Sequence, residues 1–136
     1  MIFEPHEIEY LRSALVGRLA TMQPDGTMQN SPIGFSFNED LGTIDVAGYQ
    51  MSRSQKFRNV GTNPNVALVV DDIASQDPWR VRCLEIRGTA EQAEVEITAP
   101  EQDGAIIRIT PRRIISFGID DLDTPAHQLQ THSRNV

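Results

Sequence analysis

Two hydroxyl groups and two cations lie within five consecutive residues, 52–56. Ser52, Arg53, Ser54 and Lys56 follow the end of a predicted strand and open a predicted helix. The first turn of a helix leaves backbone N–H groups without partners and carries about half a positive charge, which favours a bound anion. We call residues 52–56 the phosphate seat, because hydroxyls and cations at a helix start suit a phosphate group. A purely structural interpretation is also open, in which Ser52 caps the helix and the two cations point into solvent.

The charge distribution of the chain is consistent with a local anion site. The 136 residues include 12 basic and 19 acidic ones, a net charge of −7, which disfavours nucleic acid or an anionic membrane as a partner. Residues 46–70 nevertheless contain no Asp or Glu, while Arg53, Lys56 and Arg58 give this segment a local charge of +3. The alternative explanation is chance spacing in a sequence that uses arginine in place of lysine.

Other chemistries have less support in the sequence. A single cysteine, Cys83, excludes an internal disulfide and a cysteine-rich zinc site, and we interpret it as a small hydrophobic residue of a strand. The histidines lie near the chain ends, at His6, His127 and His132, so no metal site is predicted. Tyr49, beside the phosphate seat, either donates a proton or packs in a turn. No catalytic residue is therefore assigned.

The elements that must position the phosphate seat are short. A helix is predicted over residues 5–15, with Gly17 after its end, and a second short helix follows Ser52 and stops at Gly61. Apolar alternation and turn residues predict strands over residues 18–22, 28–37, 43–47, 66–70, 81–90, 105–109 and 114–117. The connections among the first strands are too short for crossover helices, so the sheet is predicted to be antiparallel.

This order of elements predicts a small β-barrel. Its interior has little room, so a cofactor is expected in a groove at the rim or between two subunits, and we expect a homodimer. Residues 1–118 are predicted to form the cofactor-binding domain and residues 119–136 a polar tail. No apolar run approaches the roughly 18 residues of a membrane helix, and the N-terminus lacks a signal-peptide pattern. We therefore expect no membrane partner and a cytoplasmic protein.

Several short motifs of the chain occur in the same order in a known family. They are Ser31-Pro32-Ile33-Gly34-Phe35, Ser54-Gln55-Lys56-Phe57-Arg58-Asn59-Val60, Asn63-Pro64-Asn65-Val66-Ala67, Pro78-Trp79 and Glu85-Ile86-Arg87-Gly88. With them, residues 8–118 resemble the pyridoxamine 5'-phosphate oxidase-like, or FMN-binding, split barrels. More narrowly, the chain resembles the branch that uses the deazaflavin coenzyme F420, and within it the group that contains dehydrotetracycline reductases.

The resemblance implies a mainly β fold with a bound cofactor. This fold is a six-stranded antiparallel split β-barrel with short flanking helices, which forms a homodimer and holds a phosphate-bearing flavin or deazaflavin at the subunit interface. Position by position, Ser54 and Lys56 match the serine and lysine that bind the phosphate in the family. Ser52 and Arg53 are their neighbours in the phosphate seat.

The resemblance also implies residues around the cofactor ring. Gly48 falls where a strand end passes beside the cofactor, and Ser31, Pro32 and Ile33 lie on the strand that lines the ring. Trp79 either stacks on the substrate or ring or seals the dimer interface. These five residues complete the set of predicted cofactor-binding residues.

Two positions depart from the pattern of the family. Gln55 stands where many relatives have a basic residue, which removes one charge from the phosphate seat. Phe117 stands where a tryptophan is common, at the implied contact to the partner's ring system.

The resemblance and the phosphate seat together imply an oxidoreductase. It would transfer a hydride from reduced coenzyme F420 to a conjugated carbon–carbon double bond, as in an enone or quinone-like compound, of a small organic substrate such as a polyketide. In such a reaction the cofactor supplies the chemistry, while the protein positions the reacting carbons and excludes water. Two alternatives stay open, an FMN-dependent oxidoreductase of the same fold and a non-catalytic flavin- or deazaflavin-binding protein.

Overall fold

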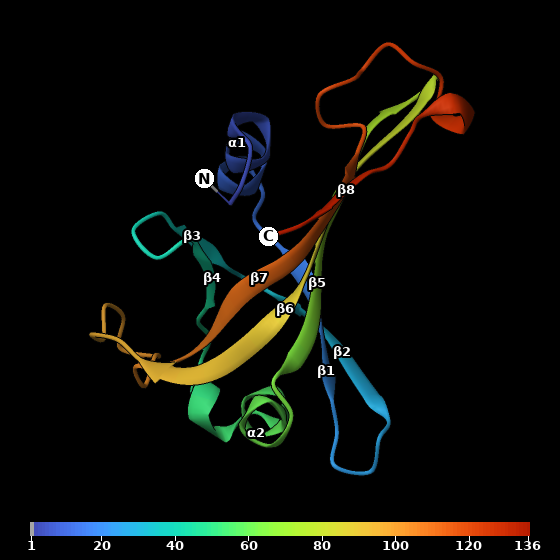
Figure 1. The fold of residues 1–136 in the computed structure, drawn as a ribbon. Coiled ribbons are helices and arrows are strands. Elements are labelled where there is room, and N and C mark those ends of the chain that lie inside the picture. Colours follow the sequence, from blue (N-terminus) through green and yellow to red (C-terminus); the bar gives the residue numbers. More distant parts are fainter. Residues whose placement is uncertain (1) are drawn as a thin grey trace.

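Eight strands form one antiparallel sheet, with short helices at its margins (Figure 1). The computed structural model describes residues 2–136. The helices are α1 (Pro5–Ser13), η1 (Met51–Arg53), α2 (Gln55–Thr62) and η2 (Ala126–Gln128). The strands are β1 (Gly17–Met22), β2 (Met28–Ile33), β3 (Ser36–Asn38), β4 (Thr43–Val46), β5 (Asn65–Gln76), β6 (Trp79–Glu94), β7 (Ala105–Phe117) and β8 (His132–Asn135). None of the helices within residues 2–136 is long and apolar enough to span a membrane.

The strands follow the order β2-β1-β5-β6-β7-β4-β3, and β8 also pairs with β7. Every pairing is antiparallel. Figure 1 shows the long strands β5, β6 and β7 twisting through the centre of the molecule, with α1 and α2 on opposite sides of the view. The prediction of a mainly β antiparallel fold with two short helices is confirmed.

The structure has eight strands, whereas the sequence pattern predicts seven and the family resemblance implies six. One reason is that the run 28–37 pairs with two different neighbours. Up to Ile33 it pairs with β1, where Ile33 lies opposite Gly17, whereas from Ser36 it pairs with β4, where Ser36 lies opposite Asp45. The chain must bend at residues 34–35 to reach both partners, so β2 and β3 are separate strands. The other additional strand is β8.

The two predicted C-terminal strands are one continuous strand, β7, because a bulge accommodates Pro111. Arg87 pairs with Arg113 but Gly88 pairs with Pro111, so Arg112 is skipped in the ladder. A proline has no N–H to donate to the neighbouring strand. The register shift at the bulge lets the strand continue past Pro111 without that hydrogen bond. A Cβ atom on Gly88 would overlap the carbonyl oxygen of Thr110, so this close approach requires glycine.

The core fixes the position of α2, and with it the phosphate seat. Inward-facing residues of the central strands are fully buried, among them Leu68, Leu84, Ile86, Ile107, Ile109 and Ile114. From α2, Val60 joins this core, and the fully buried Asn59 donates from Nδ2 to Thr21 Oγ1 at 3.0 Å and to Gln29 Oε1 at 3.2 Å. Two hydrogen bonds to β1 and β2 thus hold the helix in one orientation.

The polar segment 119–136 ends in strand β8 instead of leaving the fold. Arg113 pairs with Asn135 and Ser116 with His132, so β8 covers the edge of β7. The Arg134 guanidinium binds the carboxylate of Glu7, which is fully buried in α1. Both chain ends therefore meet at α1, which agrees with their positions in Figure 1.

Candidate functional site

A cleft of about 520 Å³ opens beside the start of α2. The ends of β2 and β4, the turn η1, helix α2 and the loop before β7 contribute its lining residues, which are Pro32, Ile33, Gly34, Ala47, Gly48, Tyr49, Met51, Ser54, Lys56 and Gln102. Five of the predicted cofactor-binding residues thus line one cleft, although they come from three separate segments of the chain. They are Pro32, Ile33, Gly48, Ser54 and Lys56.

The cleft combines an apolar part with a polar part. Ile33 and Met51 are almost completely buried and form its apolar part. The backbone at Gly48 approaches Met51 so closely that a Cβ atom there would stand 3.3 Å from the Met51 methyl group. Ser54 and Lys56 form the polar part, at the start of α2. Such a lining suits a ligand that joins an apolar ring system to an anionic group.

The residue that caps α2 is Ser54, whereas the structural interpretation of the sequence assigned this role to Ser52. Residues Met51–Arg53 already form the 3-10 turn η1, so the α-helix begins only at Gln55. The Ser54 hydroxyl accepts the Phe57 N–H at 3.2 Å and donates to the Met51 carbonyl oxygen at 2.8 Å. The N–H groups of the first two helical residues, Gln55 and Lys56, precede the intrahelical bonds and stay available to an anion.

The cations of the phosphate seat are free of acidic partners. None of the ion pairs among residues 2–136 involves Lys56 or Arg53. Lys56 is half-buried in the cleft lining, and Arg53 is exposed. Gln55 instead supports the helix, since it donates to Asn59 Oδ1 at 2.8 Å and accepts from Arg58 at 2.7 Å. The departure from the family pattern at Gln55 therefore leaves Lys56 as the cation inside the cleft.

A carboxylate that the sequence analysis missed also reaches the phosphate seat. Asp103 Oδ2 accepts the backbone N–H of Ser52 at 3.1 Å and also accepts the Ser52 hydroxyl. Gln102 lines the cleft and forms an isolated β-bridge with Tyr49, which holds this loop in place. Asp103 and Gln102 lie in the polar stretch 91–104, where no periodicity or motif distinguishes them.

Four predicted cofactor-binding residues lie outside the lining of the cleft: Ser31, Ser52, Arg53 and Trp79. The Ser31 hydroxyl oxygen is buried and has no hydrogen-bond partner among residues 2–136. Trp79 lies at the turn of the β5–β6 hairpin, 51% exposed, and the neighbouring Arg80 donates to the Leu122 carbonyl oxygen at 3.1 Å. In Figure 1 this hairpin extends to the top of the view, away from α2 at the bottom. Trp79 therefore does not contact the cleft of its own chain.

Comparisons with known proteins agree with this arrangement. The family model described as Pyridoxamine 5'-phosphate oxidase matches residues 4–117. The chain belongs to this family. It is also 45% identical over 130 residues to the 5a,11a-dehydrotetracycline/5a,11a-dehydrooxytetracycline reductase of Streptomyces rimosus subsp. rimosus, which covers 93% of this chain and 92% of that protein. By its similarity to this reductase, the chain is a reductase, an enzyme of the oxidoreductase class.

Solved structures support the same fold. The conserved hypothetical protein Rv2991 from Mycobacterium tuberculosis superimposes with a TM-score of 0.71 at 23% identity, over 92% of this chain and 90% of that chain. A structure named F420 Reductase gives a TM-score of 0.60 at 26% identity, over 80% of this chain and 94% of that chain. The predicted family resemblance and the predicted split-barrel fold are therefore confirmed.

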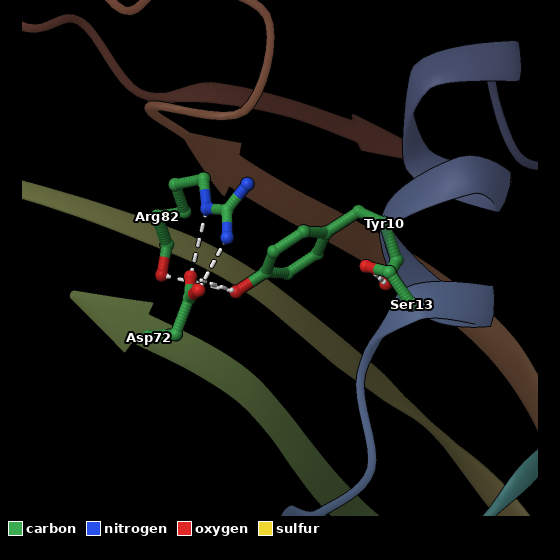
Figure 2. Close-up of polar contacts among 4 residues, drawn as sticks. All are labelled: Tyr10, Ser13, Asp72 and Arg82. Atoms are coloured by element: carbon green, nitrogen blue, oxygen red, sulfur yellow. Dashed lines mark hydrogen bonds and ion pairs between the residues drawn. The ribbon is translucent and has the colours of Figure 1, made fainter. Parts of the chain in front are cut away.

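This family member also contains a second polar cluster, which Figure 2 shows between α1 and the β5–β6 hairpin. The Tyr10 hydroxyl donates to Asp72 Oδ1 at 2.8 Å, and Arg82 Nε donates to the same oxygen at 2.8 Å. The Arg82 guanidinium also lies 5.1 Å from the Tyr10 ring centroid. Burial and the bond to Asp72 raise the pKa of Tyr10, whereas the bond from Arg82 lowers the pKa of Asp72. The phenol thus stays protonated beside an ionised carboxylate, and the cluster attaches α1 to the sheet.

The cysteine behaves as the sequence predicted. Cys83 is half-buried in β6, and burial raises its pKa to about 11. A thiol with such a pKa is not a nucleophile at neutral pH. Cys83 is a packing residue of the strand.

Proposed function

We propose that this protein takes a hydride from reduced coenzyme F420, delivers it to a conjugated carbon–carbon double bond of a small polyketide-like substrate, and acts as a homodimer. One observation carries the proposal: Lys56 and the start of α2 line the same cleft as the apolar residues Ile33 and Met51. The 45% identity to a dehydrotetracycline reductase supports the substrate class. The likeness to a structure named F420 Reductase supports the cofactor.

The residues of the cleft fit a cofactor that joins a flat ring system to a phosphate. The Lys56 ammonium and the free N–H groups at the start of α2 would hold the phosphate, and the Ser54 hydroxyl would join them by exchanging its bond to the Met51 carbonyl oxygen for one to the phosphate. Pro32 and Ile33 at the end of β2 would lie along the ring side of the cofactor. Ser31 precedes them, but its buried hydroxyl lies outside the cleft lining, so we assign it no contact with the ligand.

When bound and reduced, the deazaflavin supplies the hydride. The chain has to hold the ring in one place, and the anchor at Lys56 and Ser54 does so from one end. The apolar side chains of Ile33 and Met51 exclude water from the ring side of the cleft. Fixing both reactants in this way removes much of the entropic barrier to transfer.

Tyr49 is the candidate for a proton donor to the substrate. Of the two tyrosines of the chain, Tyr49 lines the cleft, while Tyr10 belongs to the second polar cluster. The Tyr49 side chain is 82% exposed, so turn packing does not account for its position. A substrate that enters the cleft from solvent would meet this phenol first.

The exposed β5–β6 hairpin supports the proposed homodimer. Ile73 and Trp79 are both 51% exposed on this hairpin, and Leu15 is 85% exposed at the end of α1. Exposed apolar side chains of this size favour burial against another protein surface. We place Trp79 at the subunit interface, where it either stacks on the partner's ligand or seals the contact. Sedimentation equilibrium should give twice the chain mass, and Trp79→Ala should weaken the association.

A titration of the cofactor-free protein tests the cofactor assignment. We expect F420 to bind with micromolar or tighter affinity and FMN to bind more weakly, as followed by cofactor fluorescence. Lys56→Ala should weaken F420 binding by roughly 10- to 150-fold, the range for losing a hydrogen bond to a charged group. Arg112→Ala is the matched control, because it removes one exposed positive charge that does not line the cleft.

Turnover of reduced F420 with conjugated enones, followed by F420 absorbance, tests the reaction. If F420 binds tightly but no conjugated substrate oxidises the reduced cofactor, the protein is the non-catalytic alternative. Preferential binding of FMN would indicate a flavin enzyme of the same fold. Equal affinities of wild type and Lys56→Ala for F420 would refute the assignment of the phosphate seat.

A further inference from the structure

A carboxylate from another part of the chain binds the phosphate seat at Ser52. Asp103 accepts both the backbone N–H and the hydroxyl of Ser52. Ser52 is one of the two serines whose hydroxyls are predicted from the sequence to bind a phosphate. An internal anion therefore already binds the Ser52 end of the seat, two residues before Ser54.

The loop before β7 fixes this carboxylate at the cleft. The second oxygen of Asp103, Oδ1, accepts the backbone N–H of Ala105 at 3.1 Å. The preceding residue, Gln102, lines the cleft and is bridged to Tyr49. The hydrogen bond from the Ser52 hydroxyl lowers the pKa of Asp103, so the carboxylate is ionised at neutral pH. Asp103 is thus a fixed negative charge beside the cleft.

The charges around the phosphate seat sum to a small positive value. Lys56 is the charged side chain that lines the cleft, Arg53 adds a second positive charge at its edge, and Asp103 subtracts one. Lys56, Arg53 and Asp103 therefore sum to one net positive charge. The exposed Arg58 guanidinium, which is bound to the neutral Arg53 carbonyl oxygen at 2.8 Å and to Gln55 at 2.7 Å, keeps its charge and adds a further positive charge outside the cleft lining.

We propose that Asp103 tunes the charge preference of the phosphate seat: its negative charge reduces the advantage that the positively charged seat would otherwise give a doubly charged phosphomonoester over a singly charged phosphodiester. F420 carries a phosphodiester, with one negative charge, whereas the terminal phosphate of FMN carries roughly −1.5 to −2 at neutral pH. Each additional negative charge on the phosphate group at the seat is repelled by Asp103. This inference rests on the proposed function and names the residue that would discriminate between the two cofactors.

The size of the effect follows from Coulomb's law. Two hydrated unit charges about 6 Å apart change a binding constant by roughly threefold. Removing the charge of Asp103 should therefore tighten FMN binding about tenfold and F420 binding about threefold. The preference for F420 over FMN should fall by about threefold, and the affinity for riboflavin, which has no phosphate, should not change.

The experiment compares Asp103→Asn with Glu101→Gln. Glu101 is an exposed carboxylate in the same loop that does not line the cleft, so the control removes the same charge elsewhere. Dissociation constants for F420, FMN and riboflavin are measured for the wild type and both variants at pH 7.5, and thermal midpoints report on folding. If Asp103→Asn does not fold, Asp103→Ser, which keeps a hydrogen-bond acceptor, must give the same shift.

The possible outcomes separate this inference from the proposed function. A selective gain for FMN in the Asp103 variant, with riboflavin unchanged, supports the inference. Equal changes for all three ligands, or a loss of FMN and F420 binding together, would show that Asp103 only holds the loop, and would overturn it. Failure of the wild-type protein to bind F420 would overturn the proposed function and the inference with it, whereas F420 binding with an unchanged preference overturns the inference alone.

Discussion

The C-terminal strand β8 is joined to helix α1 by a buried ion pair, and breaking this pair should destabilise the whole domain. The Glu7 oxygens Oε1 and Oε2 lie 2.6 Å and 3.0 Å from the Arg134 guanidinium nitrogens. Glu7 is completely buried, and its only other donor among residues 2–136 is the Glu4 N–H, at 2.7 Å. Arg134 also donates to the Ile2 carbonyl oxygen at 2.8 Å. Arg134→Ala would therefore leave a buried carboxylate with one donor.

The magnitude follows from the burial of the two partners. Removing one partner of a buried ion pair costs about 3–5 kcal/mol, chiefly because the remaining charge stays buried. The Arg134 side chain is 31% exposed and that of Glu7 1%, so water can partly replace the guanidinium. We therefore expect the free energy of unfolding to fall by about 3 kcal/mol, the lower end of that range. The double variant Glu7→Leu/Arg134→Met should lie within about 1 kcal/mol of the wild type, because no charge is left buried.

Urea unfolding followed by far-UV circular dichroism measures this difference. Arg112→Ala is the matched control, an exposed arginine on β7 without a hydrogen-bonded side chain in residues 2–136, and it should change the free energy by no more than about 0.5 kcal/mol. If Arg134→Ala costs less than about 1 kcal/mol, the pair does not hold the C-terminal segment to the domain. The conclusion that β8 is an integral strand would then be refuted.

Three further predictions concern the sheet and the anchor of α2. Asn59→Ala should lower the free energy of unfolding by about 1–3 kcal/mol, because the buried Thr21 hydroxyl loses its partner, and an unchanged urea midpoint would contradict this. Gly88→Ala should cost at least about 1–3 kcal/mol, since the new methyl group overlaps the Thr110 carbonyl oxygen, and a variant as stable as the wild type in thermal unfolding would disprove the close approach. The raised pKa of Cys83, about 11 against an ordinary 9.0, means that the unfolded thiol ionises first as the pH rises. The stability from the protonated thiol is present below pH 9.0 and lost between 9.0 and about 11, so the urea midpoint of Cys83→Ala should decline less steeply across that range than that of the wild type.

The local part of the candidate site could be predicted because its residues are neighbours in the sequence. Ser54 and Lys56 stand at a helix start, where unpaired N–H groups are a property of the helix itself. The interpretation of Cys83 as a strand residue depended only on the alternation around it. Even so, Ser54 caps α2 instead of the expected Ser52, because the 3-10 turn that precedes α2 has no recognisable pattern in the sequence.

The amino-acid sequence by itself determined the antiparallel strands, the short helices and the place of Ser54 and Lys56 at a helix start, since hydrophobic periodicity, turn residues and helix starts are short-range properties. Tertiary structure alone decided the contacts between distant segments. Asp103 meets Ser52 across 51 residues, and Arg134 meets Glu7 across 127. The strand His132–Asn135 contains no apolar side chain, so hydrophobic periodicity does not predict a strand there. These elements are placed because a buried charge and an exposed strand edge each require a partner, and only the folded chain determines which residue supplies it.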